Sequence, residues 1–298
     1  MPATETRSST GVLVAALSLA ALTVALLQTA VVPVLGVIAH QLGVSSVAVS
    51  WAVTANLLAA AAATPLIGRL ADLYSKKRVL VAVLLVVALG SLLAALTTSL
   101  LWLIVARVLQ GVSFSLYPIC VAILRDELPE ERIVGALAVL SGTLGFGGGT
   151  GLVVTGLLMS GSAGYHRVFW LSLGFTVLVL AVVARWVPAR PGSGTGTIDW
   201  LGALGLAAGL TALLLAITQG NAWGWAAPGT LGCAALGAGM LGCWWVWERG
   251  RAHPLVSTRM LARRAMLLTN LATIFVGMGL YFGFLGLTQF VQLPRSVA

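Results

Sequence analysis

The chain has 298 residues, of which 59% are hydrophobic and 8% are charged, and its formal net charge is +9 at pH 7. Soluble domains carry about a quarter charged residues, so this composition excludes a soluble globular protein with an ordinary surface. The apolar residues form long runs broken by short polar segments. A run of about 20 apolar residues crosses a bilayer as a helix, and continuous runs predict helices rather than the alternating strands of a β-barrel.

Nine such runs predict nine membrane-spanning helices. In chain order they cover residues 11–38, 48–70, 79–98, 101–124, 134–160, 167–188, 199–218, 226–247 and 266–293. The first run is too long for the core of a cleaved signal peptide, which has about 7–15 apolar residues.

The runs group into segments with different expected roles. Residues 1–10 form a cytoplasmic tail, 11–188 a six-helix N-terminal half, and 189–198 a flexible cytoplasmic linker rich in Gly and Ser. Residues 199–247 form an inserted two-helix pair and 248–265 a basic cytoplasmic loop. Residues 266–298 are expected to hold the first helix of an incomplete C-terminal half.

The basic residues indicate how the chain is oriented, and they do not form a nucleic-acid surface. With the N-terminus in the cytoplasm, the cluster at 76–78 and the arginines of 248–265 lie inside, whereas Arg167 and Arg295 lie outside. The positive-inside rule favours this orientation, so we expect a multi-pass protein of a bacterial plasma membrane with the lipid bilayer as its partner. The basic loop either contacts anionic lipid headgroups or acts only as a topology signal.

No metal or cofactor is expected. Cys120, Cys233 and Cys243 lie in predicted spans without the spacing of a disulfide or metal site, and we interpret them as packing residues. The sequence lacks a G-x-x-x-x-G-K-[ST] loop, so ATP-driven transport is unsupported. No set of catalytic residues predicts an enzyme.

The break after the second span reads GRLADLYSKKR over residues 68–78. Gly68 and Asp72 are four residues apart and share a helix face, and Asp72 is surrounded by cations that include Lys76 and Arg78. A carboxylate there can accept charge-assisted hydrogen bonds or interact with a helix N-terminus. The alternative interpretation is a plain cytoplasmic loop.

This segment resembles the G-x-L-A-D-x-x-G-[RK]-[RK] loop that joins helices two and three in the major facilitator superfamily. The resemblance implies an all-α transmembrane helical bundle and a gating role, as a latch between two halves, for Gly68, Asp72, Lys76 and Arg78. Ser75 stands where the family has a second Gly, and a turn that needs positive φ is less comfortable with Ser.

Arg107 lies inside the fourth predicted span, where inserting an arginine costs about 2.5–3.5 kcal/mol. Helical spacing puts Arg107, Gln110 and Gly111 on one face. The segment RVLQG resembles the R-x-x-Q-G signature of the same superfamily, whose arginine is linked to proton coupling. The resemblance implies that role for these three residues, with protons as the coupling ion. The alternative is a structural arginine tied to backbone carbonyls.

A run of glycines fills the fifth predicted span and includes Gly142, Gly147, Gly151 and Gly156. A dinucleotide-binding loop is excluded because the run lacks the sixth-position glycine and the strand–turn–helix context. In a membrane span such glycines make a smooth face for a neighbouring helix. The position resembles the exporter-specific glycine motif of helix five and implies antiport, although Leu152 replaces the proline of the family motif.

Six spans, a linker and two further spans resemble the fourteen-helix drug/proton antiporter branch of the superfamily, in its bacterial, actinobacterial type. Segments 198–202, 219–225 and 252–256 also resemble that branch, and its additional helices imply that the chain is truncated at its C-terminus. The branch has an aspartate in helix one where Leu27 stands here, and no acid lies deep in a predicted span. Coupling would then depend on Arg107 or on helices beyond the chain.

Polar and aromatic side chains within the spans predict a substrate cavity. The candidates are Gln28, Asn56 and Tyr117 in the first half, and Asn270 and Tyr281 on one face of the ninth span. Aromatic rings can stack on cationic or planar substrates. The alternative for each polar residue is a hydrogen bond between helices.

Together these observations predict a secondary active transporter that exports small amphipathic or drug-like molecules by alternating access, through proton antiport. The small-molecule substrate would bind near the midplane between two helical halves. Two alternatives remain, an uptake facilitator of the same superfamily and a non-transporting, truncated membrane fragment.

Overall fold

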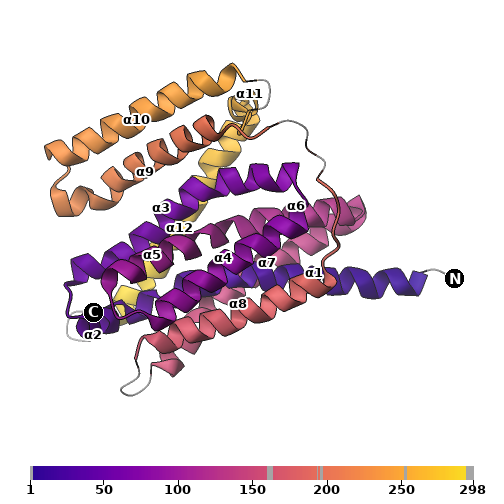
Figure 1. Cartoon of the computed structure of the whole chain (residues 1–298), viewed down its shortest axis with the longest axis horizontal. Helices are drawn as coiled ribbons and strands as arrows, with labels where there is room; N and C mark the ends of the chain where they lie inside the picture. Colours follow the sequence, from indigo (N-terminus) through magenta and orange to yellow (C-terminus); the bar gives the residue numbers. More distant parts are fainter. Residues whose placement is uncertain (1–2, 160–163, 193, 195–196, 252–253, 293–298) are drawn as a thin grey trace.

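The computed structural model describes residues 3–159, 164–192, 194, 197–251 and 254–292, with the backbone alone described for 3–9, 280, 281 and 283–292. Every regular element in these residues is a helix, as the apolar runs predicted (Figure 1). In chain order they are α1 (Ala3–Thr29), the 3-10 helix η1 (Val32–Val34), α2 (Leu35–Leu42), α3 (Ser46–Leu73), α4 (Lys76–Leu96), α5 (Leu100–Gly111), the 3-10 helix η2 (Val112–Ser115), α6 (Leu116–Glu127), α7 (Glu130–Leu158), α8 (His166–Trp186), α9 (Trp200–Trp223), α10 (Pro228–Arg249), α11 (Thr258–Leu261) and α12 (Arg264–Gln292).

Eight helical segments in the described chain are long and apolar enough to cross a membrane, and they correspond to the first eight predicted spans. The first segment joins α1, η1 and α2, and the fourth joins α5, η2 and α6. The ninth predicted span is α12, a helix of 29 residues. Its described side chains form a shorter apolar segment over Arg264–Gly279.

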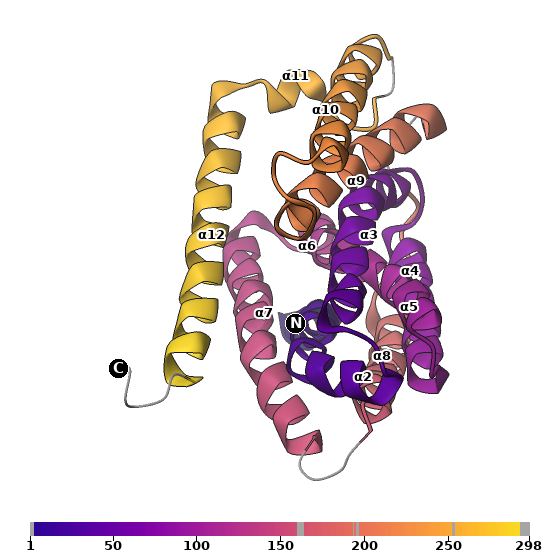
Figure 2. The same cartoon turned by 90° about the vertical axis from the view of Figure 1, so that its left-hand side faces the viewer.

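The helices α1 to α8 form one bundle, in which α1 packs on α7 and α8, α4 on α5 and α8, and α3 on α5 (Figures 1 and 2). The main buried cluster draws side chains from α1, α3, α4, α6, α7 and α8, and includes Leu17, Leu84, Leu124, Leu140 and Val183. A second cluster includes Val34, Ile38, Ala52, Leu103 and Phe169. These apolar contacts hold the buried polar residues of α5 between neighbouring helices.

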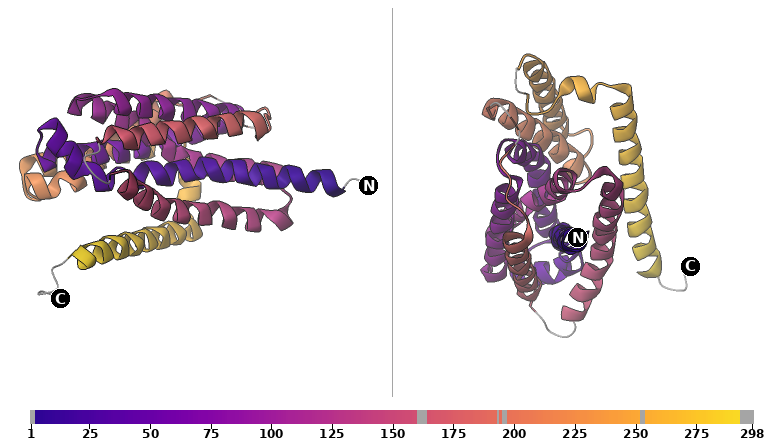
Figure 3. Two further views of the ribbon diagram at one scale, coloured as in Figure 1. Left: turned by 90° about the horizontal axis from the view of Figure 1, so that it is seen from below. Right: turned by 90° about the vertical axis from the view of Figure 1, so that its right-hand side faces the viewer.

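The helices α9 and α10 form a hairpin that packs on the bundle through α3 (Figure 1). Asp199 caps the start of α9 by accepting a 2.9 Å hydrogen bond from the N–H of Gly202. Gly224, with φ of 93°, ends this helix, because a residue without Cβ adopts positive φ at little cost. The last helix, α12, stands at the edge of the bundle on the side of α7 (Figures 2 and 3).

Candidate functional site

The most deeply buried basic side chain among the described residues is Arg107, which is 2% exposed. It lies near the end of α5, where the α-helix gives way at Gly111 to the 3-10 turn η2 before α6 begins. A buried charge in a membrane bundle needs hydrogen-bond partners, because lipid offers none.

The guanidinium of Arg107 finds its partners on three helices. Its Nε donates to the carbonyl of Ala52 on α3 at 3.1 Å. Its Nη1 donates to the carbonyl of Leu27 on α1 at 3.3 Å and to Oε1 of Gln110, one turn along α5, at 2.6 Å. These partners are all uncharged oxygens, so dipoles balance the cation.

Two further hydrogen bonds extend this network. The amide of Gln110 donates to the hydroxyl of Ser91 on α4 at 2.9 Å, and Asn56 on α3 donates to the carbonyl of Arg107 at 2.9 Å. Arg107, Gln110, Asn56 and Ser91 are all at most 3% exposed. The network therefore ties α1, α3, α4 and α5 together. We call these four residues the Arg107 network.

Glycines bring the helices of the network close together. A Cβ on Gly111 would lie 2.5 Å from the carbonyl oxygen of Asn56 and 2.8 Å from the Cβ of Ala59 on α3. A Cβ on Gly90 of α4 would lie 2.8 Å from the carbonyl oxygen of Ala106 on α5. All three distances are shorter than real side-chain contacts, so only glycine permits this spacing.

The predicted coupling residues Arg107, Gln110 and Gly111 are thus brought together, with the arginine on the backbone carbonyls that the alternative interpretation named. The geometry also explains what such a residue can do. Its acceptors sit on helices that are distant in sequence, so any relative movement of α1 or α3 changes the stabilisation of the charge. Charge-assisted hydrogen bonds are stronger than neutral ones, which makes this site sensitive to helix position.

The predicted cavity residues do not form one cluster. Asn56 belongs to the Arg107 network, whereas the hydroxyl of Tyr117 on α6 lies 2.9 Å from that of Ser141 on α7. Gln28 is half-buried on α1, and Asn270 is exposed on α12. The side chain of Tyr281 lies outside the described residues.

The predicted glycine motif of α7 divides into two pairs. A Cβ on Gly147 would press on Leu22 and Ala25, and one on Gly151 would press on Thr29, so both glycines lie against α1. Gly142 and Gly156 are exposed, and a Cβ on either would meet nothing within 4 Å. A neighbouring helix therefore lies against Gly147 and Gly151, whereas no described residue lies against the Cβ positions of Gly142 and Gly156.

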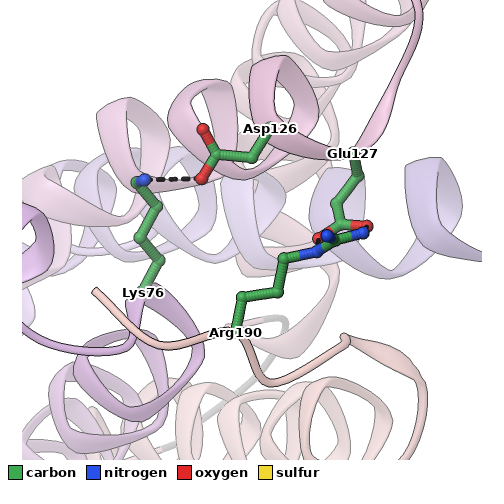
Figure 4. A network of polar contacts seen from close by, with 4 residues as sticks. All are labelled: Lys76, Asp126, Glu127 and Arg190. Atoms are coloured by element: carbon green, nitrogen blue, oxygen red, sulfur yellow. Dashed lines mark hydrogen bonds and ion pairs between the residues drawn. The ribbon is translucent and has the colours of Figure 1, made fainter. Parts of the chain in front are cut away.

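The turn between α3 and α4 contains only Tyr74 and Ser75. Lys76 donates to Asp126 at the end of α6, at 2.5 Å, and not to Asp72 (Figure 4). The carboxylate of Asp72 is exposed and has no ion pair within the described ranges. Because the turn is so short, α4 begins at Lys76 and this side chain reaches α6.

The other members of the turn lie apart from these charges. Gly68 is half-buried on α3, with open space around the position of a Cβ. Arg78 is exposed and lines an apolar depression with Ile67, Leu70 and Tyr74.

The linker after α8 lies on this turn. Arg190 forms a two-point ion pair with Glu127 of α6 (Figure 4), and the hydrogen bonds and charge of Glu127 raise the pKa of Arg190 above its ordinary value. The N–H of Gly194 donates to the carbonyl of Asp72 at 2.8 Å. A Cβ on Gly192 would collide with the backbone of Leu73, so the linker packs tightly here.

Sequence reasoning missed a second buried polar group at the α9–α10 end. Glu248, assigned to a loop from its position after an apolar run, lies in the last turn of α10 and is 1% exposed. Its carboxylate accepts a hydrogen bond from the N–H of Val256 at 2.8 Å. Nearby, Asp199 accepts from Trp247 at 2.8 Å and pairs with Arg251 at 3.2 Å.

Burial alone would raise the pKa of Asp199, but the donors of Gly202 and Trp247 and the charge of Arg251 outweigh it and hold the pKa below its ordinary value. The sequence signal for this cluster was weak. It consisted of an acid directly before one apolar run and another directly after the next.

The chain is similar in sequence to known membrane transporters. The sequence profile described as the Major Facilitator Superfamily matches residues 17–295. The chain is 35% identical to an MFS-type transporter of Mycobacterium tuberculosis over 232 residues, and this aligned region covers 76% of the chain and 33% of that protein. Over 259 residues, it is 30% identical to a multidrug resistance protein B homolog of the same organism, covering 84% of the chain and 47% of the relative.

The chain is also 29% identical over 251 residues to a uridine/deoxyuridine transporter of Lactococcus lactis, covering 81% of the chain and 52% of that protein. Among solved structures, the POT family transporter PepTSo matches with a TM-score of 0.57 and 14% identity, over 80% of this chain and 52% of that one. This likeness concerns the fold alone. The chain spans about one third to one half of the length of these relatives.

Proposed function

The chain belongs to the Major Facilitator Superfamily, a family of membrane transporters and not of enzymes, and we propose that it serves export of small amphipathic or drug-like molecules by alternating access. Protons moving in the opposite direction would drive this export. The multidrug resistance protein B homolog supports the choice of substrate class, since the name of that relative refers to multidrug resistance.

The Arg107 network is the observation that carries the proposal. A cation held by the carbonyls of Ala52 and Leu27 and by Gln110 responds to the relative position of α1, α3 and α5. In alternating access one helical half rocks against the other around a central site. We infer that α1, α3 and α5, which belong to one half, also shift relative to one another during this motion. The cation is then stabilised differently in each arrangement, which can couple the motion to a change in proton occupancy nearby.

The turn between α3 and α4 is proposed to act as the latch. Lys76 with Asp126 and Arg190 with Glu127 connect α4, the linker and α6 (Figure 4). Asp72 keeps its carboxylate exposed, so it is available to a partner on the other half of a transporter. In this proposal the N-terminus and the α3–α4 turn face the cytoplasm, following the positive-inside rule.

The inserted hairpin α9–α10 and the drug/proton antiporter branch belong to the same proposal. The hairpin packs on α3 and contributes no described residue to the Arg107 network. We propose that Gly147 and Gly151 give α7 a sliding contact with α1, as the antiporter motif implies, while Gly142 and Gly156 are free to meet other helices.

A second candidate, nutrient uptake, is favoured by the likeness to the uridine/deoxyuridine transporter of Lactococcus lactis. Flux measurements separate the two candidates. The protein encoded by the complete reading frame would be reconstituted in vesicles and tested with a fluorescent cationic dye and with labelled uridine, each with and without a pH gradient.

Dye movement out of the compartment that corresponds to the cytoplasm, driven by an inward proton gradient, is the expected result. Uridine uptake without dye transport would support the second candidate. Dye movement that ignores the gradient would refute proton antiport, and absence of flux for both substrates would refute both candidates.

A further inference from the structure

The α9–α10 hairpin carries an apolar groove with a volume of about 600 Å³. This volume lies within the range of about 300–1,000 Å³ that is typical of small-molecule sites. The groove is lined by Leu201 and Gly205 of α9 and by Leu236, Gly239 and Cys243 of α10, among others. A Cβ on Gly239 would meet no atom within 4 Å, so the missing side chain forms part of the hollow.

The groove occupies one half of the hairpin only. Toward the Gly224 turn the helices touch, since a Cβ on Gly237 would lie 2.6 Å from the backbone nitrogen of Leu213. Toward the other end Trp244 lies beside Gly205, with 3.7 Å from its Cδ1 to the position of a Cβ there. The indole of Trp244 therefore forms part of the groove lining next to Gly205.

The length of the groove decides what fits in it. Its lining on α10 runs from Ala235 to Trp247, which is about 18 Å along the axis at about 1.5 Å per residue. Half of the hydrocarbon core of a bilayer is about 15 Å thick, and a membrane helix needs about 30 Å. The groove therefore matches one lipid leaflet and is too short for a full transmembrane helix.

Arg251 lies at the end of the groove that is farthest from the Gly224 turn. The guanidinium of Arg251 lies 3.9 Å from the ring centroid of Trp247, a groove residue, and that of Arg249 lies 5.2 Å from the ring of Trp245. The side chain of Arg251 is 42% exposed and its Nε faces Asp199 at 3.2 Å. A guanidinium has five N–H donors, so its other donors remain available to an anion.

We propose that this groove binds an acyl chain of an anionic phospholipid, with the phosphate on Arg251. The lipid would come from the leaflet that meets this end of the hairpin, which is the cytoplasmic leaflet in the orientation proposed above. Basic clusters beside membrane helices attract anionic headgroups, and the apolar lining accepts the chain below them. The proposal depends on α9 and α10 lying in the membrane and not on transport, so a lipid-binding assay tests it separately from flux.

The experiment uses the chain in phosphatidylcholine vesicles with increasing phosphatidylglycerol whose acyl chains are brominated, and records quenching of tryptophan fluorescence. Trp244 and Trp247 line the groove, so bromine within it quenches them. The expected result is saturable quenching at a small fraction of phosphatidylglycerol. Equal, non-saturating quenching by brominated phosphatidylglycerol and phosphatidylcholine would overturn the proposal, because it would indicate unselective lipid contact.

Matched variants test the groove and its charge. Gly239→Leu fills the groove and is expected to abolish saturable quenching, whereas Gly242→Leu, on the same helix with equally open space outside the groove lining, should leave it unchanged. Arg251→Gln should weaken the preference for phosphatidylglycerol by about fivefold. Asp199→Asn breaks the same ion pair but keeps the arginine and an N-cap residue, so the preference should persist.

Three results would overturn the proposal. Unchanged quenching in Gly239→Leu would place the lipid elsewhere. An equal loss in Asp199→Asn and Arg251→Gln would make the effect structural. A change of oligomeric state in Gly239→Leu would assign the groove to a second protein chain.

Discussion

Replacing Arg107 by methionine separates its energetic role from its proposed role in coupling. The wild-type guanidinium donates hydrogen bonds to Ala52, Leu27 and Gln110. Hydrogen bonds between membrane helices contribute about 0.6 kcal/mol each on average and up to about 1.7, so the variant loses about 2–5 kcal/mol. It also avoids the cost of an arginine in the bilayer, about 2.5–3.5 kcal/mol.

These terms nearly cancel, so Arg107→Met should unfold within about 2 kcal/mol of the wild type. Arg107→Ala also removes most of the side-chain volume and should be less stable than Arg107→Met by about 2–5 kcal/mol. Both variants should still insert in the membrane. Gradient-driven efflux should be lost in both, because neither carries the cation.

The assay is unfolding of the purified protein in mixed detergent, followed by dye efflux from vesicles with and without a pH gradient. Arg185→Met is the control, since Arg185 is exposed in the last turn of α8. Wild-type efflux in Arg107→Met would remove Arg107 from the mechanism. A loss of more than about 5 kcal/mol of unfolding free energy in Arg107→Met would show that the main role of Arg107 is to stabilise the packing of its helices.

Three further predictions concern packing and charge. Gly111→Ala should destabilise the protein by about 1–3 kcal/mol through overpacking against α3. Gly142→Ala, whose Cβ would meet open space, should change stability by less than about 1 kcal/mol. Unfolding in detergent measures the stability of both variants. Gly192→Ala should displace the linker from the α3–α4 turn and increase its rate of proteolytic cleavage, and an unchanged rate would contradict the tight contact. The pKa of Asp199 is lower in the folded protein than its ordinary value, so its ionised form stabilises the fold at neutral pH, and this stabilisation is lost as the pH falls below about 4. An acid-induced change in tryptophan fluorescence should therefore occur in the wild type and be absent in Asp199→Asn.

The sequence by itself determined the helices and their approximate limits. Apolar runs are local features, and each membrane helix satisfies its own backbone hydrogen bonds, so the composition of one run is enough to predict one helix. For the same reason Arg107 stood out as unusual, because a charged residue within an apolar run is costly wherever that run packs. The family resemblance also rested on short local segments, such as residues 68–78 and 107–111.

Only the tertiary structure decided the partners of these residues. The acceptors of Arg107 include backbone carbonyls 55 and 80 residues away, and any residue can supply a carbonyl, so no sequence pattern marks them. Lys76 pairs with Asp126, 50 residues later, and not with the nearby Asp72, because the helix that begins at Lys76 turns this side chain toward α6. Likewise Glu248 accepts a hydrogen bond from the N–H of Val256, because the segment after α10 folds back onto it, and composition alone does not encode this fold-back.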